Sequence, residues 1–87
     1  MSAWKKTLQK LLLGASHSNL DFEAVCNALR RLGFQERIKG SHHIFYKTGI
    51  EEILNLQPQN GKGKPYQMRQ IREILIKYQM TGEADEN

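Results

Sequence analysis

Apolar residues recur at helical spacing near both ends of the chain. Between residues 3 and 13 they fall at i, i+4, i+7 and i+8, which predicts a short amphipathic helix. A second helix is predicted from Asp21, with Asn19 as the alternative N-cap, to Gly33, because these residue types suit helix ends. The apolar positions of the two helices are Trp4, Leu8, Leu11 and Leu12, then Phe22, Val25, Cys26, Leu29 and Leu32.

From residue 34 the spacing of apolar positions changes to two. Phe34, Glu36 and Ile38 alternate with basic and polar residues, which predicts a strand with one solvated basic face. "HHIFYK" and "IEEILNLQ" become the next two strands of an antiparallel meander, because the short "GS" and "TG" turns precede them. Pro58 and "QNGKGK" predict a mobile loop, and Pro65 predicts the first turn of a last helix.

The last helix has an inner stripe of apolar residues and a basic outer side, formed by Arg69, Arg72 and Lys77. The inner stripe is predicted to contain Met68, Ile71, Ile74, Leu75 and Tyr78. Without the first helix, the α-β-β-β-α order is that of double-stranded RNA-binding domains, in which two helices cover one face of a three-stranded sheet. The predicted fold is therefore an α+β sandwich of this type with an extra N-terminal helix.

The predicted elements divide the chain into three segments. Residues 1–20 form an N-terminal extension with the short amphipathic helix, residues 21–80 form one compact domain, and residues 81–87 form an acidic tail. The tail has no apolar period and is predicted to be disordered. The chain has 87 residues, which is the length of a single domain.

The positive charge of the chain indicates which kinds of partner it can bind. The net charge is +4, and the last seven residues hold three acids and no base, so the first 80 residues carry +7. Such a surface attracts phosphate backbones, acidic proteins or anionic lipid, and the alternative is a basic face that is only solvated. No apolar run is long enough to cross a membrane, Lys10 interrupts the only signal-like stretch, and Cys26 has no partner for an internal disulfide. We expect a cytoplasmic protein with no membrane contact.

The segment "GSHH" at residues 40–43 holds the best candidates for chemistry. An imidazole can remove the proton of an RNA 2′-OH, whose oxygen then attacks the adjacent phosphorus. Neighbouring strand residues point to opposite faces, so His42 and His43 cannot both face one site. If Phe45 belongs to the core, His43 shares its face and His42 points outward with Tyr46. If Ile44 and Tyr46 are the core residues, the assignment reverses.

Lys39 and Lys47, which flank the histidines, and Lys62 and Lys64 on the following loop are candidates to stabilise the charged phosphorane. The predicted RNA-binding residues are Lys39, Ser41, Lys47, Lys62, Lys64, Arg69 and Arg72. Cys26 lies on an apolar helix stripe and is predicted to be a small core residue. A metal site built from Cys26, His17, His42 and His43 lacks recognisable ligand spacing, so we expect no metal and no cofactor.

The stretch "FEAVCNALRRLGFQERIKGSHHIFYK", a third strand ending at Pro58 and the helix "MRQIREILIKY" together resemble HicA, the toxin of bacterial HicA–HicB toxin–antitoxin modules. The resemblance runs from about Asp21 to Tyr78. It implies the double-stranded RNA-binding-domain fold, an mRNA interferase that cleaves RNA with a histidine of the G-S-H segment, and neutralisation by a HicB antitoxin. Relatives keep the first histidine more regularly, which favours His42. Many relatives carry a histidine after the proline, where this chain has Gln59.

Two other functions fit the same residues. One is a non-catalytic RNA-binding module of the same fold. The other is a protein-interaction adaptor, whose stripe of Trp4, Leu8 and Leu12 and basic face would meet an acidic partner. The N-terminal helix, which lies outside the resemblance, would serve docking, self-association or regulation.

Overall fold

The computed structural model describes residues 3–14 and 20–80. The predicted N-cap alternative Asn19 and the predicted acidic tail lie outside the described residues. The elements are α1 (Ala3–Leu13), α2 (Phe22–Arg31), β1 (Gln35–Lys39), β2 (His42–Lys47), β3 (Ile50–Leu56) and α3 (Pro65–Lys77). This order confirms the predicted α+β arrangement.

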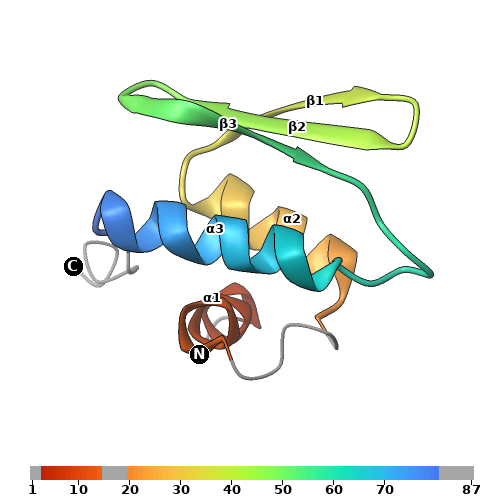
Figure 1. The fold of residues 1–87 in the computed structure, drawn as a ribbon, viewed down its shortest axis with the longest axis horizontal. Helices are drawn as coiled ribbons and strands as arrows, with labels where there is room; N and C mark the ends of the chain where they lie inside the picture. The colour runs from red at the N-terminus through yellow and green to blue at the C-terminus, as the bar shows by residue number, and fades with distance from the viewer. Residues whose placement is uncertain (1–2, 15–19, 81–87) are drawn as a thin grey trace.

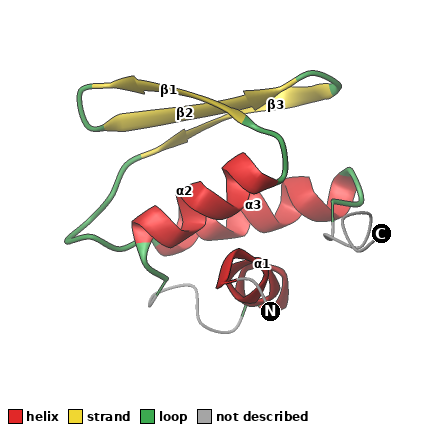
Figure 2. Ribbon diagram, turned by 180° about the vertical axis from the view of Figure 1, so that it is seen from behind, coloured by secondary structure: helices red, strands yellow, loops and turns green. Residues whose placement is uncertain are grey.

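The described elements form three layers (Figure 1). The antiparallel sheet, with strand order β1-β2-β3, is the first layer, and α2 and α3 cover one of its faces. The view from behind shows α1 on the side of those two helices that faces away from the sheet (Figure 2). Helix α1 contacts both α2 and α3. None of the described helices is long and apolar enough to cross a membrane.

Helix α1 is part of the core, and this corrects the expectation that its apolar stripe is open to a partner. Trp4 is 7% exposed and Leu11 is fully buried, so the apolar stripe packs against the chain's own helices. The stripe therefore does not offer the open apolar surface that an adaptor role would need, while self-association through this helix stays a prediction. The physical reason is that α2 and α3 are apolar on two sides, and the sheet covers only one of them.

Local sequence signals explain the element boundaries. The Asp21 carboxylate accepts a hydrogen bond of 3.1 Å from the Ala24 N–H, which confirms the predicted N-cap of α2. Gly33, with φ of +99°, reverses the chain after α2. Pro65 occupies the first turn of α3, as predicted. The sheet contributes its buried residues to one apolar core with α2 and α3, formed by Phe45, Leu54, Leu56, Val25, Leu29, Met68, Ile71 and Leu75.

The segment between β3 and α3 differs from its prediction as a mobile loop. Its backbone is hydrogen-bonded to the start of α2, since the Phe22 N–H donates to the Gly61 carbonyl at 2.9 Å and the Gly63 N–H donates to the Leu20 carbonyl at 2.9 Å. Gln59 and Lys62 also exchange backbone hydrogen bonds across a tight turn. The loop is thus attached to the helical layer by its main chain, which a reading of side-chain types does not detect.

Ile38 also departs from its predicted place. The alternation put it on the core-facing side of β1 with Phe34, but its side chain is 62% exposed. It lies near the end of an edge strand, one residue before the turn that joins β1 to β2. The residue pattern assigns a face of the sheet, whereas burial also requires a helix below that position.

Candidate functional site

The two adjacent histidines occupy different environments on β2. Phe45 is fully buried, so the first of the two alternatives holds and His43 shares the core-facing side of the strand. The His43 side chain is 14% exposed. His42 is exposed, and the alternation along β2 puts it on the face of the sheet opposite to the buried Phe45.

His43 belongs to a hydrogen-bonded network that joins three elements. Its Nδ1–H donates to Oε2 of Glu36 at 2.7 Å, and Oε1 of Glu36 accepts from Nε of Arg30 at 2.7 Å. The His43 ring also meets Phe22 edge to face, with 4.9 Å between centroids. Burial raises the pKa of Glu36, but the hydrogen bonds from Arg30 and His43 together lower it below its ordinary value. The network links α2, β1 and β2, and we interpret it as structural.

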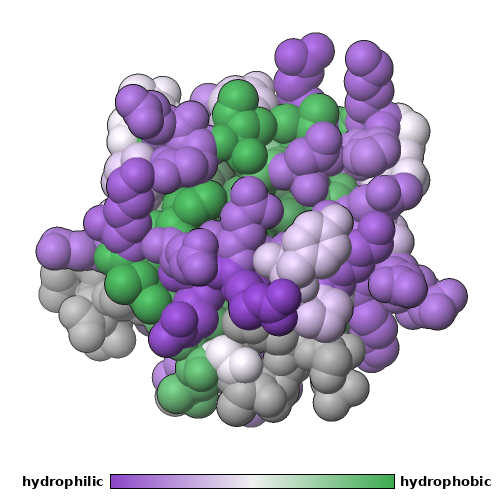
Figure 3. Space-filling view, in the orientation of Figure 1, coloured by the Kyte–Doolittle hydropathy of each residue, from purple (hydrophilic) through white to green (hydrophobic). Residues whose placement is uncertain are grey.

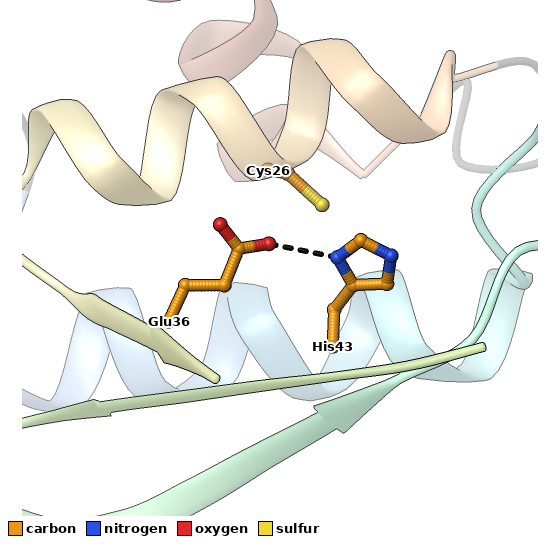
Figure 4. Close-up of side chains that lie close together, drawn as sticks. All are labelled: Cys26, Glu36 and His43. Carbon is orange, nitrogen blue, oxygen red and sulfur yellow. Dashed lines mark hydrogen bonds and ion pairs between the residues drawn. The ribbon is translucent and has the colours of Figure 1, made fainter. Parts of the chain in front are cut away.

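Cys26 faces this network from α2 (Figure 4). Its sulfur and the nearest ligand atoms of Glu36 and His43 all lie within 4.8 Å of one another. Burial, and then the negative charge of Glu36, raise the pKa of the Cys26 thiol from 9.0 to about 12. The thiol therefore keeps its proton at neutral pH and is a poor nucleophile.

A metal ion fits this cluster poorly. Cys26, Glu36 and His43 offer sulfur, oxygen and nitrogen, which are zinc ligands in principle. However, both Glu36 oxygens already accept hydrogen bonds, and the positive charge of Arg30 stands where it would repel a cation. The cluster is satisfied by the protein's own groups. Sequence spacing missed it because its members come from three separate elements.

His42 is held by a residue that the sequence did not single out. Its Nδ1 lies 2.9 Å from Oδ1 of Asn55 on β3. With the Asn55 oxygen facing the ring, Nδ1 carries the proton and donates it, so Nε2 of the neutral ring has a free lone pair. The sequence signal for Asn55 is only its place on the polar side of β3, two residues before Gln57.

Asn55 is in turn supported by α3. The buried side chain of Gln67 donates from Nε2 to the Asn55 carbonyl at 3.4 Å, and its Oε1 accepts from the Gln57 N–H at 3.4 Å. The amide of Gln67 thus pairs with the free edge of β3 as a neighbouring strand would. Gln57 also donates from Nε2 to Oγ of Ser41 at 3.0 Å, which joins the end of β3 to the turn before His42.

Four of the predicted RNA-binding residues lie at the His42 end of the sheet. Lys39 pairs directly with His42 across β1 and β2, and Ser41 is in the turn between them. Since His43 pairs with Leu56, the segment after β3 leaves the sheet at this same end. That segment contains Lys62 and Lys64, which are also predicted RNA-binding residues.

The other three predicted RNA-binding residues lie on other parts of the fold, and their binding of RNA stays a prediction. Lys47 is at the opposite end of β2, about 17 Å away at the usual rise per residue, where its ammonium lies close to Gly33. Arg72 donates from Nε to the Leu12 carbonyl at 2.8 Å and so fastens α1 to α3. Arg69 is exposed one turn before Arg72. On the same helix, Arg72 is thus directed to α1, whereas Lys77 pairs with Glu52 of β3 at 2.7 Å.

No protein-family model, curated protein or solved structure matches this chain. The structure defines a small α+β domain with an exposed, hydrogen-bonded histidine beside lysines at one end of its sheet.

Proposed function

We propose that the chain is a HicA-like toxin, a metal-independent endoribonuclease in which His42 is the general base. The observation that carries this proposal is the exposed imidazole of His42, whose Nδ1 is bonded to Asn55 and which pairs with Lys39 across the strands. The side chain is exposed, and its Nε2 has no hydrogen-bond partner among the described residues, so a large substrate can reach this nitrogen. His43, which is enclosed by Glu36 and Phe22, supports the strand instead.

The reaction follows from these groups. Nε2 of His42 removes the proton from a ribose 2′-OH, and the oxygen attacks the adjacent phosphorus. The bond from phosphorus to the 5′-oxygen breaks, which leaves a 2′,3′-cyclic phosphate, and the departing oxygen takes a proton from water. The ammonium of Lys39 stabilises the negative charge of the phosphorane. Lys62 and Lys64 bind backbone phosphates beside the site.

The proposal extends to a HicB-like antitoxin as partner. An acidic protein surface over Lys39, Lys62 and Lys64 would neutralise their charge and exclude RNA from His42 in one step. The runner-up function is a non-catalytic RNA-binding module. The adaptor reading loses support because its apolar stripe is buried within the chain.

Incubation of the purified chain with RNA in the presence of a chelator tests the function directly. We expect the RNA to become shorter, with cyclic phosphate at the new 3′ ends. RNA that stays intact but is bound would favour the non-catalytic module. RNA that is neither cut nor bound would contradict both RNA functions.

RNA affinity should fall steeply as salt is added. Each phosphate contact with single-stranded RNA contributes about −0.7 to the slope of log affinity against log salt. Reversal of Lys62 and Lys64 to glutamate should flatten that slope by about one to two units. The matched control reverses Lys6 and Lys10, which are exposed on α1 and give the same net charge. Equal flattening by both double variants would show that net charge matters and position does not.

A further inference from the structure

We infer that Arg37, Lys39 and Ile44 form a subsite that holds one nucleotide of single-stranded RNA on the outer face of the sheet. These residues, with Ile38, line a hollow of about 380 Å³. The description of this nucleotide as the neighbour of the scissile phosphate rests on the proposed ribonuclease function. The proposal that a nucleotide binds in this hollow is independent of the ribonuclease function.

The strand register places the hollow next to His42. Lys39 pairs with His42, and Arg37 pairs with Ile44, so the two pairs are successive outward-facing rows across β1 and β2. Such rows are about 7 Å apart along a strand. A nucleotide in the hollow would therefore be one step from the imidazole, on the side away from Lys62 and Lys64.

The cations of the hollow have no partner within the described part of the protein. Neither Arg37 nor Lys39 takes part in an ion pair or side-chain hydrogen bond among the described residues, although Arg30 and Lys77 do. Both side chains are exposed. Two unpaired positive charges on alternate positions of one strand, and so on one face, attract an anion. A guanidinium can bind a phosphate through two parallel hydrogen bonds.

Ile44 adds the apolar part of the subsite. It is half-buried on β2, with Arg37 opposite it on β1 and Asn55 opposite it on β3. On the sheet side of the molecule, at the top of the view, hydrophobic surface lies between projecting hydrophilic side chains (Figure 3). A base can rest on such a surface, and the planar guanidinium of Arg37 can stack on the exposed face of that base.

Size and form favour a single strand over a duplex. A volume of about 380 Å³ is near the small end of ligand pockets and suits one nucleotide. In an RNA duplex the bases are stacked inside and only the backbone and shallow groove are exposed, so no base could enter the hollow. An unpaired nucleotide supplies both the phosphate and the accessible base that these residues can bind.

The test uses a single-stranded 2′-O-methyl hexanucleotide, which binds but cannot be cleaved because it has no free 2′-OH. Its addition to the wild-type chain should shift the NMR signals of the Arg37 side-chain N–H and of the backbone amides of Lys39 and Ile44. Arg37→Ala should weaken binding about tenfold, and Arg37→Lys should recover only part of it, because charge returns without the planar group. Arg31→Ala is the matched control, since Arg31 lies over the Trp4 ring on the helical side.

The outcomes separate the subsite from the ribonuclease. If the hexanucleotide does not bind at low salt, or if Arg37→Ala binds it as well as Arg31→Ala does, the subsite is wrong even when RNA is cleaved. A partner protein that shifts the same signals while the hexanucleotide does not would identify the hollow as a protein-docking surface. If the hexanucleotide binds with the expected shifts but RNA is never cut, the subsite is supported and the proposed ribonuclease fails.

Discussion

Replacement of His42 with alanine should reduce RNA cleavage by about 100-fold or more while RNA affinity changes little. The loss is the usual contribution of a general base, and affinity is preserved because it comes mainly from phosphate contacts with lysines. The measurement is the cleavage rate of a labelled RNA at saturating enzyme, together with the dissociation constant for an uncleavable analogue.

His43→Ala is the matched control for that experiment. Because His43 donates to Glu36 and packs on Phe22, its loss should lower the midpoint of thermal unfolding. Folded His43→Ala protein should retain cleavage. If His42→Ala cuts RNA normally while folded His43→Ala is inactive, the roles of the histidines are exchanged. If both variants cut normally, neither histidine is the base.

Glu36→Ala should lower the free energy of unfolding by about 2 kcal/mol at neutral pH. The substitution removes the acceptor for both Arg30 and His43, and a broken buried ion pair costs about 3 to 5 kcal/mol. The expected value is smaller because the Arg30 side chain is 39% exposed and can regain water. Urea unfolding measures the difference. Glu51→Ala, on an exposed position of β3, is the control and should change stability by less than about 0.5 kcal/mol.

The contribution of Glu36 to the stability of the folded state should depend on pH. In the folded protein the pKa of Glu36 is lower than its ordinary value of 4.5, since the hydrogen bonds from Arg30 and His43 outweigh the effect of burial. The ionised carboxylate therefore stabilises the folded state above about pH 4.5, and this contribution is lost as pH falls toward the folded pKa. The difference between wild type and Glu36→Ala should shrink in acid. A difference that stays constant from pH 3 to 7 would mean that Glu36 acts through packing alone.

Asn55 and Arg37 show which features of the candidate site a residue pattern cannot predict. The alternation in β1 placed Arg37 on the solvated basic face of its strand, and Arg37 is exposed in the structure. The pattern did not predict that Asn55 would lie 2.9 Å from the ring of His42, because the two residues are thirteen positions apart and meet only through strand register. Arg37 was not singled out, because the subsite proposed for it depends on Ile44 across the sheet.

The sequence by itself determined the elements of this protein, since helix and strand formation depend on periodicity, caps and turns within a few residues. The Asp21 cap, the Gly33 turn and the order of the elements are all local in this sense. Only the tertiary structure decided which histidine faces outward, because positions 44 to 46 are all apolar and alternation permits either face. Packing of Phe45 beneath the sheet settles the matter. The packing of α1 on α2 and α3 likewise decided that Arg72 donates a hydrogen bond to α1. The residues of α3 alone do not show which element packs against that face of the helix.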